Sequence, residues 1–345
     1  MRHEAHEALV ALHFFLASQI FWIENVMRHV RQFCQIIRSQ TTHGRVLLYI
    51  MKPFLKWVGG KNRLLSTIEK KLPHNISEYD TYIEPFIGGG AVFFHLHKKY
   101  RFANVHISDT NAHLILCYRR LQDSHLAVIS ALSELVSSYP SDPDLQPSYF
   151  YDVRSRWNSA LDVSKLTPAQ QCVHVAEMIF LNKTCFNGLF RLNRKGEFNS
   201  SFGRYTKPPF PTSCDLKLVS ELLAGVHIHH APFHEVAEKY VKGKTFVYFD
   251  PPYRPISQTS KFVSYSAEDF DDDDQVAVAA TCKKLDQQKV SFMLSNSDPK
   301  NTVPDDDFFD VLYADFSIMP VEVCRTINNR GTKRGRISEI LVTNY

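Results

Sequence analysis

The sequence lacks the compositional bias that marks a non-globular protein. Of its 345 residues only 13 are glycine and 17 are proline, and no internal repeat or low-complexity segment interrupts the chain. These counts exclude collagen-like and wholly disordered proteins, because such chains need far more glycine, proline or unbalanced charge. The length predicts either one large α/β domain with an elaboration or two domains.

Organised cysteine is also missing. The seven cysteines are odd in number and form no C-x-x-C pair; they stand at positions 34, 117, 172, 185, 214, 282 and 324. A disulfide framework or a structural zinc site would need closer spacing. We therefore expect free thiols in a reducing, cytoplasmic setting.

No apolar run is suited to a membrane span. The stretch Ala8–Ile23 is apolar and aromatic, but His13, Ser18 and Gln19 interrupt it, and a span needs about 20 apolar residues. It also lacks the basic start and small-residue cleavage site of a signal peptide. We expect no membrane partner. We expect residues 1–50 to be an appended helix or a poorly ordered extension of unknown role, and the functional core to begin at Met51.

A strong charge of one sign is absent from the chain as a whole. Forty basic and 36 acidic residues give a net charge of +4, which excludes an overall basic coat for nucleic acid but permits a local patch. Residues 183–207 contain one acidic residue, Glu197, and six basic residues: Lys183, Arg191, Arg194, Lys195, Arg204 and Lys207. Aromatic residues interleave them. This pattern suits nucleic acid, although a solvated loop with a few core anchors explains it about as well. A second basic cluster spans 325–336.

The order of apolar runs predicts an α/β sheet with helices on both faces. The expected strands are Thr81–Phe86, Val105–Ser108, Val226–His229, Thr245–Asp250, Ser291–Ser295, Phe309–Ala314 and Ile337–Thr343. The expected helices of this part are Arg63–Lys71, Ala91–Lys99, Ala112–Leu121 and Ala267–Lys284. Residues 125–225 break the alternation and are expected to form an inserted, mainly helical domain, with helices at Leu126–Ser138, Tyr149–Ala160 and Ala169–Leu181.

Two glycine-rich motifs point toward a ligand site. Lys56–Lys61 contains Gly-Gly-Lys, but Leu55 and Asn62 stand where a phosphate-binding P-loop needs Gly and Ser or Thr. The P-loop is therefore rejected. The run Glu84–Gly90 ends in three glycines between a strand and a helix, where the backbone can approach a ligand closely.

A dinucleotide fingerprint is disfavoured at this second motif because Phe93 replaces its third glycine. With Asp109 at the end of the next strand, the pattern still suits a ribose-bearing ligand, because a carboxylate can accept hydrogen bonds from two hydroxyls. A structural strand-turn-helix explains the glycines almost as well.

A third motif, Asp250-Pro251-Pro252-Tyr253, follows the strand-like run Thr245–Phe249. The prolines hold the backbone extended, so that a carboxylate and a free carbonyl can accept both N–H groups of an exocyclic amine. Tyr253 offers a ring on which a planar base can stack. A structural turn is the plainer explanation.

In this order the three motifs resemble the Dam-type (D12 class) DNA N6-adenine methyltransferases, which depend on S-adenosylmethionine. The resemblance runs from about Met51 to Tyr345. It includes four further segments: Asn182–Arg191, Gly196–Asn199 with Phe202–Tyr205, Leu294–Asp298 and Glu339–Tyr345. It implies a Rossmann-like methyltransferase sheet built from residues 51–124 and 226–345, with 125–225 as the target-recognition insert.

The resemblance also implies roles for single residues. Asp250, Pro251, Pro252 and Tyr253 would be catalytic, with Asp250 between cofactor and target. The other cofactor-binding residues would be Trp57, Lys61, Glu84, Phe86, Gly88, Gly90 and Asp109. The DNA-binding residues would be Lys56, Phe186, Asn187, Arg191 and Arg204. The target adenine would rotate out of the duplex, commonly within GATC, and no metal would be needed because the sulfonium methyl is already activated.

Other acceptors remain open at this point. Related Asn/Asp-Pro-Pro-Tyr arrangements also serve RNA adenine or protein glutamine, since an amide and an aminopurine present similar N–H groups. A catalytically silent DNA-binding regulator is a further alternative. The resemblance implies double-stranded DNA as partner, a nucleoid-associated location, a cognate restriction endonuclease as a possible partner, and a monomer or weak dimer.

Overall fold

The computed structural model describes residues 54–254, 270–324 and 336–345. All of them belong to the compact unit Met51–Tyr345. The expectations for residues 1–50, and for the basic cluster at 325–336 apart from the backbone of Arg336, lie outside the described residues. Within the described ranges, no helix combines the length and apolar character that a membrane crossing requires.

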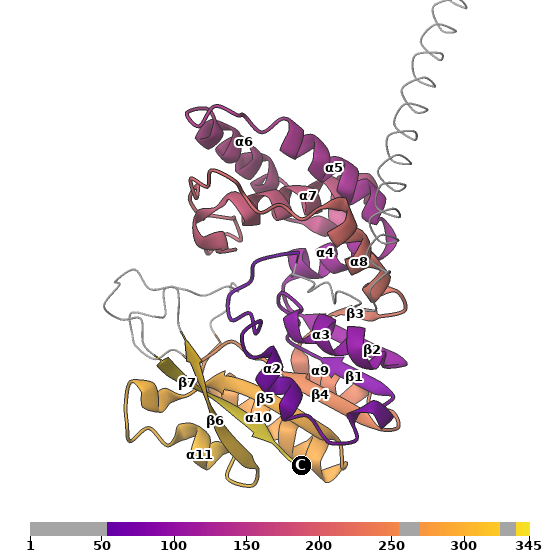
Figure 1. Cartoon of the computed structure of the whole chain (residues 1–345), viewed down its shortest axis with the longest axis vertical. Helices are drawn as coiled ribbons and strands as arrows, with labels where there is room; N and C mark the ends of the chain where they lie inside the picture. Colours follow the sequence, from indigo (N-terminus) through magenta and orange to yellow (C-terminus); the bar gives the residue numbers. More distant parts are fainter. Residues whose placement is uncertain (1–53, 255–269, 325–335) are drawn as a thin grey trace, which may run out of the picture. The chain divides into compact units, whose positions relative to one another are not determined.

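A seven-stranded sheet carries the site. Its spatial order is β3 (His227–His230), β2 (Asn104–Asp109), β1 (Thr81–Glu84), β4 (Thr245–Phe249), β5 (Ser291–Ser297), β7 (Arg336–Thr343) and β6 (Ser317–Cys324) (Figure 1). The first five strands run parallel, whereas β7 is antiparallel to both β5 and β6. The order reverses between β1 and β4. In open α/β sheets, ligands bind at the carboxyl ends of the strands beside such a reversal.

Alternate side chains of the central strands enter two different cores. Tyr82 and Tyr248 pack in one core with α2 (Leu65–Lys70), α3 (Ala91–Tyr100) and α4 (Ala112–Asp123). Ile83 and Val247 pack in the other with α9 (Phe233–Lys239), α10 (Asp272–Gln287) and α11 (Phe308–Leu312). Because side chains alternate across a strand, helices cover both faces, and the α/β expectation is confirmed.

Between β2 and β3 the chain forms further helices: α5 (His125–Ser137), α6 (Gln146–Asn158), α7 (Pro168–Thr184) and α8 (Ser213–Leu223). They pack against one another and against α4. Thr167 begins α7 with a capping box followed by Pro168, and Thr212 begins α8 with a capping box that it forms with Asp215. Short 3₁₀ turns lie at Ile76–Glu78, Val163–Lys165, Phe186–Gly188 and Pro299–Asn301.

The expected strand Phe309–Ala314 is wrong, because this segment forms the helix α11. Phe309 and Tyr313 are buried, whereas Val311 between them is 68% exposed. A strand would have put all three side chains on one face. The spacing of four residues between the buried rings instead fits one face of a helix.

The sequence analysis missed the edge strand β6. Pro320 lies in its middle, paired with Ile340 of β7, and proline cannot donate a hydrogen bond to a neighbouring strand. β6 tolerates the proline because it pairs with β7 alone. The helices α8 and α9 were also not predicted.

Candidate active site

Asp250 stands at the carboxyl end of β4, directly after five buried strand residues. Its Oδ1 lies 2.6 Å from Lys61 Nζ and accepts a 3.0 Å hydrogen bond from Ser295 Oγ of β5. The carboxylate is 20% exposed. Burial raises the pKa of Asp250, and the Lys61 ammonium opposes that rise. The site therefore holds a carboxylate that is desolvated, fixed in direction and accessible from one side.

The carbonyl of Pro252 is held by a pair of buried amides. Gln275 Nε2 of α10 donates to it over 2.9 Å, and Asn296 Nδ2 of β5 donates to Gln275 Oε1 over 3.0 Å. Both amide residues are fully buried. Sequence reasoning gave Gln275 no role, because a lone glutamine in an amphipathic helix carries no pattern that reveals its partner.

Tyr253 is fixed at its ring and at its hydroxyl. Lys61 Nζ lies 4.6 Å from the ring centroid, a cation–π contact. The hydroxyl donates a 2.5 Å hydrogen bond to Glu339 Oε2 of β7. Burial and the nearby carboxylates raise the pKa of Tyr253 well above its usual range, so the ring keeps its phenol proton. The structure thus adds Glu339 to the site.

Glu84 ends the neighbouring strand β1 and is almost fully buried. Tyr82 OH donates to its Oε2 over 2.5 Å. Burial raises the pKa of Glu84 well above its usual range, and the charge of Asp250 adds to that rise. Two carboxyl groups therefore share the edge where the strand order reverses, with Lys61 as the nearby cation.

The glycines after β1 make room for protein side chains. Gly88 and Gly90 have φ of +45° and +71°, which L side chains rarely adopt. A Cβ on Gly88 would lie 2.9 Å from Trp57 Cδ1, and one on Gly90 would lie 2.6 Å from Tyr118 Oη. The turn therefore requires glycine before any ligand is considered, and the indole of Trp57 lies directly on it.

Asp109 ties the end of β2 to this glycine turn. Its Oδ2 accepts from the Gly88 amide over 3.2 Å, and its Oδ1 accepts from the Asn111 amide over 2.9 Å. Burial raises the pKa of Asp109, while the backbone amides act in the opposite direction. Phe86, in the same loop, stacks on Phe233 of α9 at 5.1 Å. Phe233 therefore packs at this edge of the sheet, and no pattern in the sequence indicated this contact.

The residues expected to contact DNA cluster around a turn that follows α7. Phe186 is 51% exposed, and Asn187 has φ of +59°. Arg191 is exposed, and its Nε donates to Asn199 Oδ1 over 2.7 Å. Arg204 is exposed with φ of +53°.

The aliphatic part of Lys56 packs against the same turn. A Cβ built on Gly188 would lie 2.4 Å from Lys56 Cδ. The structure therefore places the end of β4 next to the glycine turn. The residues expected to contact DNA form a second group, around residues 186–188.

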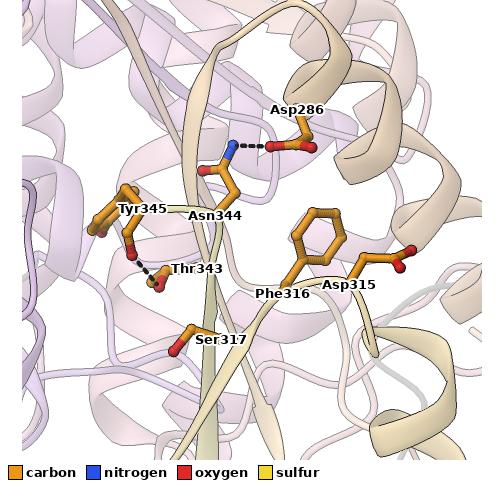
Figure 2. Close-up of a pocket in the computed structure, with 7 residues that line it drawn as sticks. All are labelled: Asp286, Asp315, Phe316, Ser317, Thr343, Asn344 and Tyr345. Atoms are coloured by element: carbon orange, nitrogen blue, oxygen red, sulfur yellow. Dashed lines mark hydrogen bonds between the residues drawn. The ribbon is translucent and has the colours of Figure 1, made fainter.

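Two kinds of feature could mark another site in the rest of the described chain: a metal-binding cluster or a hollow. No group of three or more His, Cys, Asp or Glu in residues 54–254, 270–324 and 336–345 could hold a metal ion. A hollow of about 240 Å³ lies at the end of β7 and the start of β6, and Asp250 is not among the residues that line it (Figure 2). In it Asn344 Nδ2 donates to Asp286 Oδ1 over 2.9 Å, so its polar groups fasten the chain end.

Residues 57–327 match the family model described as D12 class N6 adenine-specific DNA methyltransferase. The chain belongs to this family. The D12 match covers the strand-end motifs and the whole helical segment between β2 and β3. It confirms that the protein is an adenine-specific DNA methyltransferase and disfavours the RNA, glutamine and silent-regulator alternatives.

Curated relatives match this chain over nearly their full length. Type II methyltransferase M.MjaIII of Methanocaldococcus jannaschii is 45% identical over 299 residues, covering 86% of this chain and 99% of that protein. Type II methyltransferase M1.LlaDCHI of Lactococcus lactis subsp. cremoris is 36% identical, covering 86% and 96%. A DNA adenine methylase of Vibrio cholerae is 31% identical, covering 84% and 95%.

Proposed function

We propose that this enzyme transfers a methyl group from S-adenosylmethionine to N6 of adenine in double-stranded DNA, within GATC, after the adenine rotates out of the duplex. Membership in the D12 family identifies adenine as the substrate base and DNA as the nucleic acid. The observation that carries the rest is the end of β4: the Asp250 carboxylate, fixed by Lys61 and Ser295, adjoins the Tyr253 ring, fixed by Glu339. A preorganised acceptor beside a planar platform suits an aminopurine.

The carboxyl edge of β1 and β2 fits S-adenosylmethionine. Asp109 would hold the ribose, and the turn containing Gly88 and Gly90 would face the methionine part. Trp57, Lys61, Glu84 and Phe86 would complete this pocket. The fit rests on the close, glycine-dependent turn at Gly88 and on the two carboxyl groups at the strand ends. When bound, the cofactor supplies a methyl group already activated on a sulfonium.

The chain's own part in the reaction is to orient and polarise the adenine amine. The N6 lone pair is delocalised into the ring, so N6 is a weak nucleophile until its hydrogens are drawn toward acceptors. Both described contacts of Asp250 use Oδ1, and we assign Oδ2 to one N–H. By the resemblance to the family, the second N–H would go to the Pro251 carbonyl, while the Pro252 carbonyl accepts a hydrogen bond from Gln275.

The proposed sequence readout rests on the side chains around the turn at 186–188. N6 lies inside the stack of a duplex and cannot be reached there, so the base must leave it. Phe186, half exposed at the turn, would fill or wedge the space, and Asn187 would lie against the duplex. Lys56 and Arg191 would read guanine, for which a guanidinium has matching geometry. Arg204 would bind phosphate.

The two Type II methyltransferase relatives support one further proposal about partners. We propose that the enzyme protects DNA sites against a restriction endonuclease of the same specificity, and that it acts as a monomer or weak dimer.

One experiment tests the proposed function. The full chain is incubated with radiolabelled S-adenosylmethionine and, in parallel, with a GATC duplex, duplexes changed at one base, single-stranded RNA and a protein mixture. Label should enter the GATC duplex alone, and nucleoside mass spectrometry should find N6-methyladenine. Label in RNA or protein, or equal labelling of the changed duplexes, would contradict the proposal.

A further inference from the structure

Asn182 occupies an unusual position at the end of α7. The residue is 1% exposed, and its amide makes three hydrogen bonds to main-chain atoms, two at the distant Lys56 and one at Gly188 in the turn that follows α7. Oδ1 accepts from the Lys56 amide over 2.8 Å. Nδ2 donates to the Lys56 carbonyl over 2.8 Å and to the Gly188 carbonyl over 3.2 Å. One side chain therefore joins the segment that precedes Trp57 to the turn proposed to contact DNA.

Trp57 extends this connection to the cofactor edge. Its indole stacks on Phe190 at 5.3 Å with an interplanar angle of 21°. The same side chain limits the glycine turn, since a Cβ on Gly88 would lie 2.9 Å from Trp57 Cδ1 and one on Gly89 would lie 2.9 Å from Trp57 Cβ. The Gly88 amide in turn donates to Asp109. A continuous series of contacts therefore runs from Gly188 through Asn182, Lys56 and Trp57 to the end of β2.

We infer that Asn182 is a positioning residue that couples the reading of target DNA to the binding of the cofactor. This inference rests on the proposed function, in which Lys56 reads guanine and the Gly88 turn holds the cofactor. The amide holds the backbone on both sides of Lys56, so a shift of Lys56 toward a base moves Trp57 and the turn beneath it. Such coupling is reciprocal: cognate DNA tightens cofactor binding by the factor by which the cofactor tightens DNA binding.

The alternative is that Asn182 only stabilises the fold, and the chain offers a matched control. Asn158 of α6 makes the same kind of contact, because its amide donates to the Phe198 carbonyl over 3.1 Å and accepts from the Phe198 amide over 2.8 Å. Both partner atoms belong to Phe198, which lies between β2 and β3. Asn158→Ala therefore removes two side-chain–to–main-chain hydrogen bonds without touching Lys56 or Trp57.

Isothermal titration calorimetry on the full chain measures the coupling. S-Adenosylhomocysteine, which cannot react, is titrated alone, with a saturating GATC duplex, and with a duplex whose guanine is replaced. We expect the wild type to bind the probe about 5–150-fold more tightly with GATC and less so with the changed duplex. In Asn182→Ala the ratio falls toward one, while Asn158→Ala keeps the wild-type ratio.

The outcomes separate this inference from the function on which it rests. A wild type that binds no S-adenosylhomocysteine contradicts the proposed function. A wild type that methylates GATC but shows no coupling, or an Asn182→Ala protein that keeps the wild-type ratio, overturns the inference. Equal loss of the ratio in Asn158→Ala also overturns it. If Asn182→Ala does not fold, Asn182→Ser, which leaves a smaller void and one polar group, should show a smaller fall in the ratio.

Discussion

The end of β4 and the turn at 186–188 hold their functional side chains in different ways. At β4 the side chains themselves are fixed: Asp250 by Lys61 and Ser295, and Tyr253 by Glu339. At the turn the main chain is fixed by Asn182, while Phe186 projects into solvent. The same protein therefore fixes side chains where we propose that it performs chemistry, and fixes backbone where we propose that it contacts a duplex.

This difference follows from what each region must do. An acceptor aimed at a developing charge gains most when it does not have to reorient during the reaction. Side chains that meet DNA must displace water and adjust to a groove, so a firm backbone under an exposed side chain suits them. We therefore expect substitutions at the end of β4 to change kcat, and substitutions around the turn to change affinity and sequence choice.

Asp250→Ala should give the largest effect and tests the rigid half of the comparison. Loss of one preorganised group at a comparable site costs about 2.7–4 kcal/mol, or roughly 10²–10³ in kcat. We expect methyl transfer to GATC to fall at least that far in a steady-state labelling assay. Its thermal unfolding midpoint should also fall, because the substitution leaves the buried Lys61 ammonium without its ion-pair partner, so turnover is compared at a temperature at which both proteins are folded. Near-normal turnover would refute the assignment of Asp250 as the acceptor.

Gly90→Ala should have the next largest effect, with Gly196→Ala as its matched control. Both positions have positive φ, +71° and +77°, so both variants incur about 1–2 kcal/mol of backbone strain. Only at Gly90 does the new Cβ also meet other atoms, 2.6 Å from Tyr118 Oη, whereas nothing lies within 4 Å at Gly196. Gly90→Ala should therefore lose about 1–3 kcal/mol more in urea unfolding and bind cofactor more weakly. Equal losses would contradict the crowding at the turn.

Arg191→Ala and Arg204→Ala test the region around the turn at 186–188 and separate base recognition from phosphate binding. Arg191 is held toward one direction by Asn199 and should discriminate bases, so its loss should reduce the preference for GATC by about 1–3 kcal/mol. Arg204→Ala should weaken all duplexes about equally and lower the salt dependence by about one phosphate contact. Binding to GATC and to single-base variants at several salt concentrations separates the two. Identical changes in both variants would remove the distinction.

Much of this fold could be predicted because buried parallel strands are continuous apolar runs. Thr245–Phe249 is such a run, and each of its residues is buried. The segment after Asp307 could not be assigned in this way, since Phe308–Tyr313 is a short run that is apolar except for Asp310 and reads like a strand until Val311 is seen to face solvent. β6 was hidden by Pro320, which is acceptable only because no strand pairs on its other side.

Of the candidate site, only the proposed reactive groups could be predicted from the sequence. Asp250, Glu84 and Asp109 stand at the ends of strands, and parallel topology alone brings such ends to one edge. The groups that hold them could not be found in this way. Gln275, Glu339 and Asn182 come from a helix, an antiparallel strand and a helix end, and no local pattern shows which distant backbone or hydroxyl each will contact.

The pH dependence of kcat should report the Asp250 carboxylate. The ionised carboxylate accepts an N–H more strongly than the protonated acid does, so kcat at saturating substrates should fall as the pH drops through the raised pKa of Asp250. Lys61 lowers that pKa, so Lys61→Met should move the fall in kcat to higher pH. The measurement is a rate profile for both proteins in a constant-ionic-strength buffer series. An unchanged or acid-shifted profile in Lys61→Met would contradict the ion pair at the end of β4.

Glu84→Gln should give the smallest effect. It tests whether the buried carboxyl group at the end of β1 lowers the stability of the folded protein. Burial raises the folded pKa of Glu84 above its unfolded value. Below about pH 4 the carboxyl is protonated in both states and the ionised form costs nothing; as the pH rises through the folded pKa, the cost of a buried charge appears in full. The unfolding midpoint of Glu84→Gln relative to wild type should therefore rise steadily from acid to neutral pH, even if the amide loses one hydrogen bond. A relative midpoint that falls with pH would mean that the ionised Glu84 stabilises the fold, and the edge of β1 would then resemble an ordinary ion-pair site.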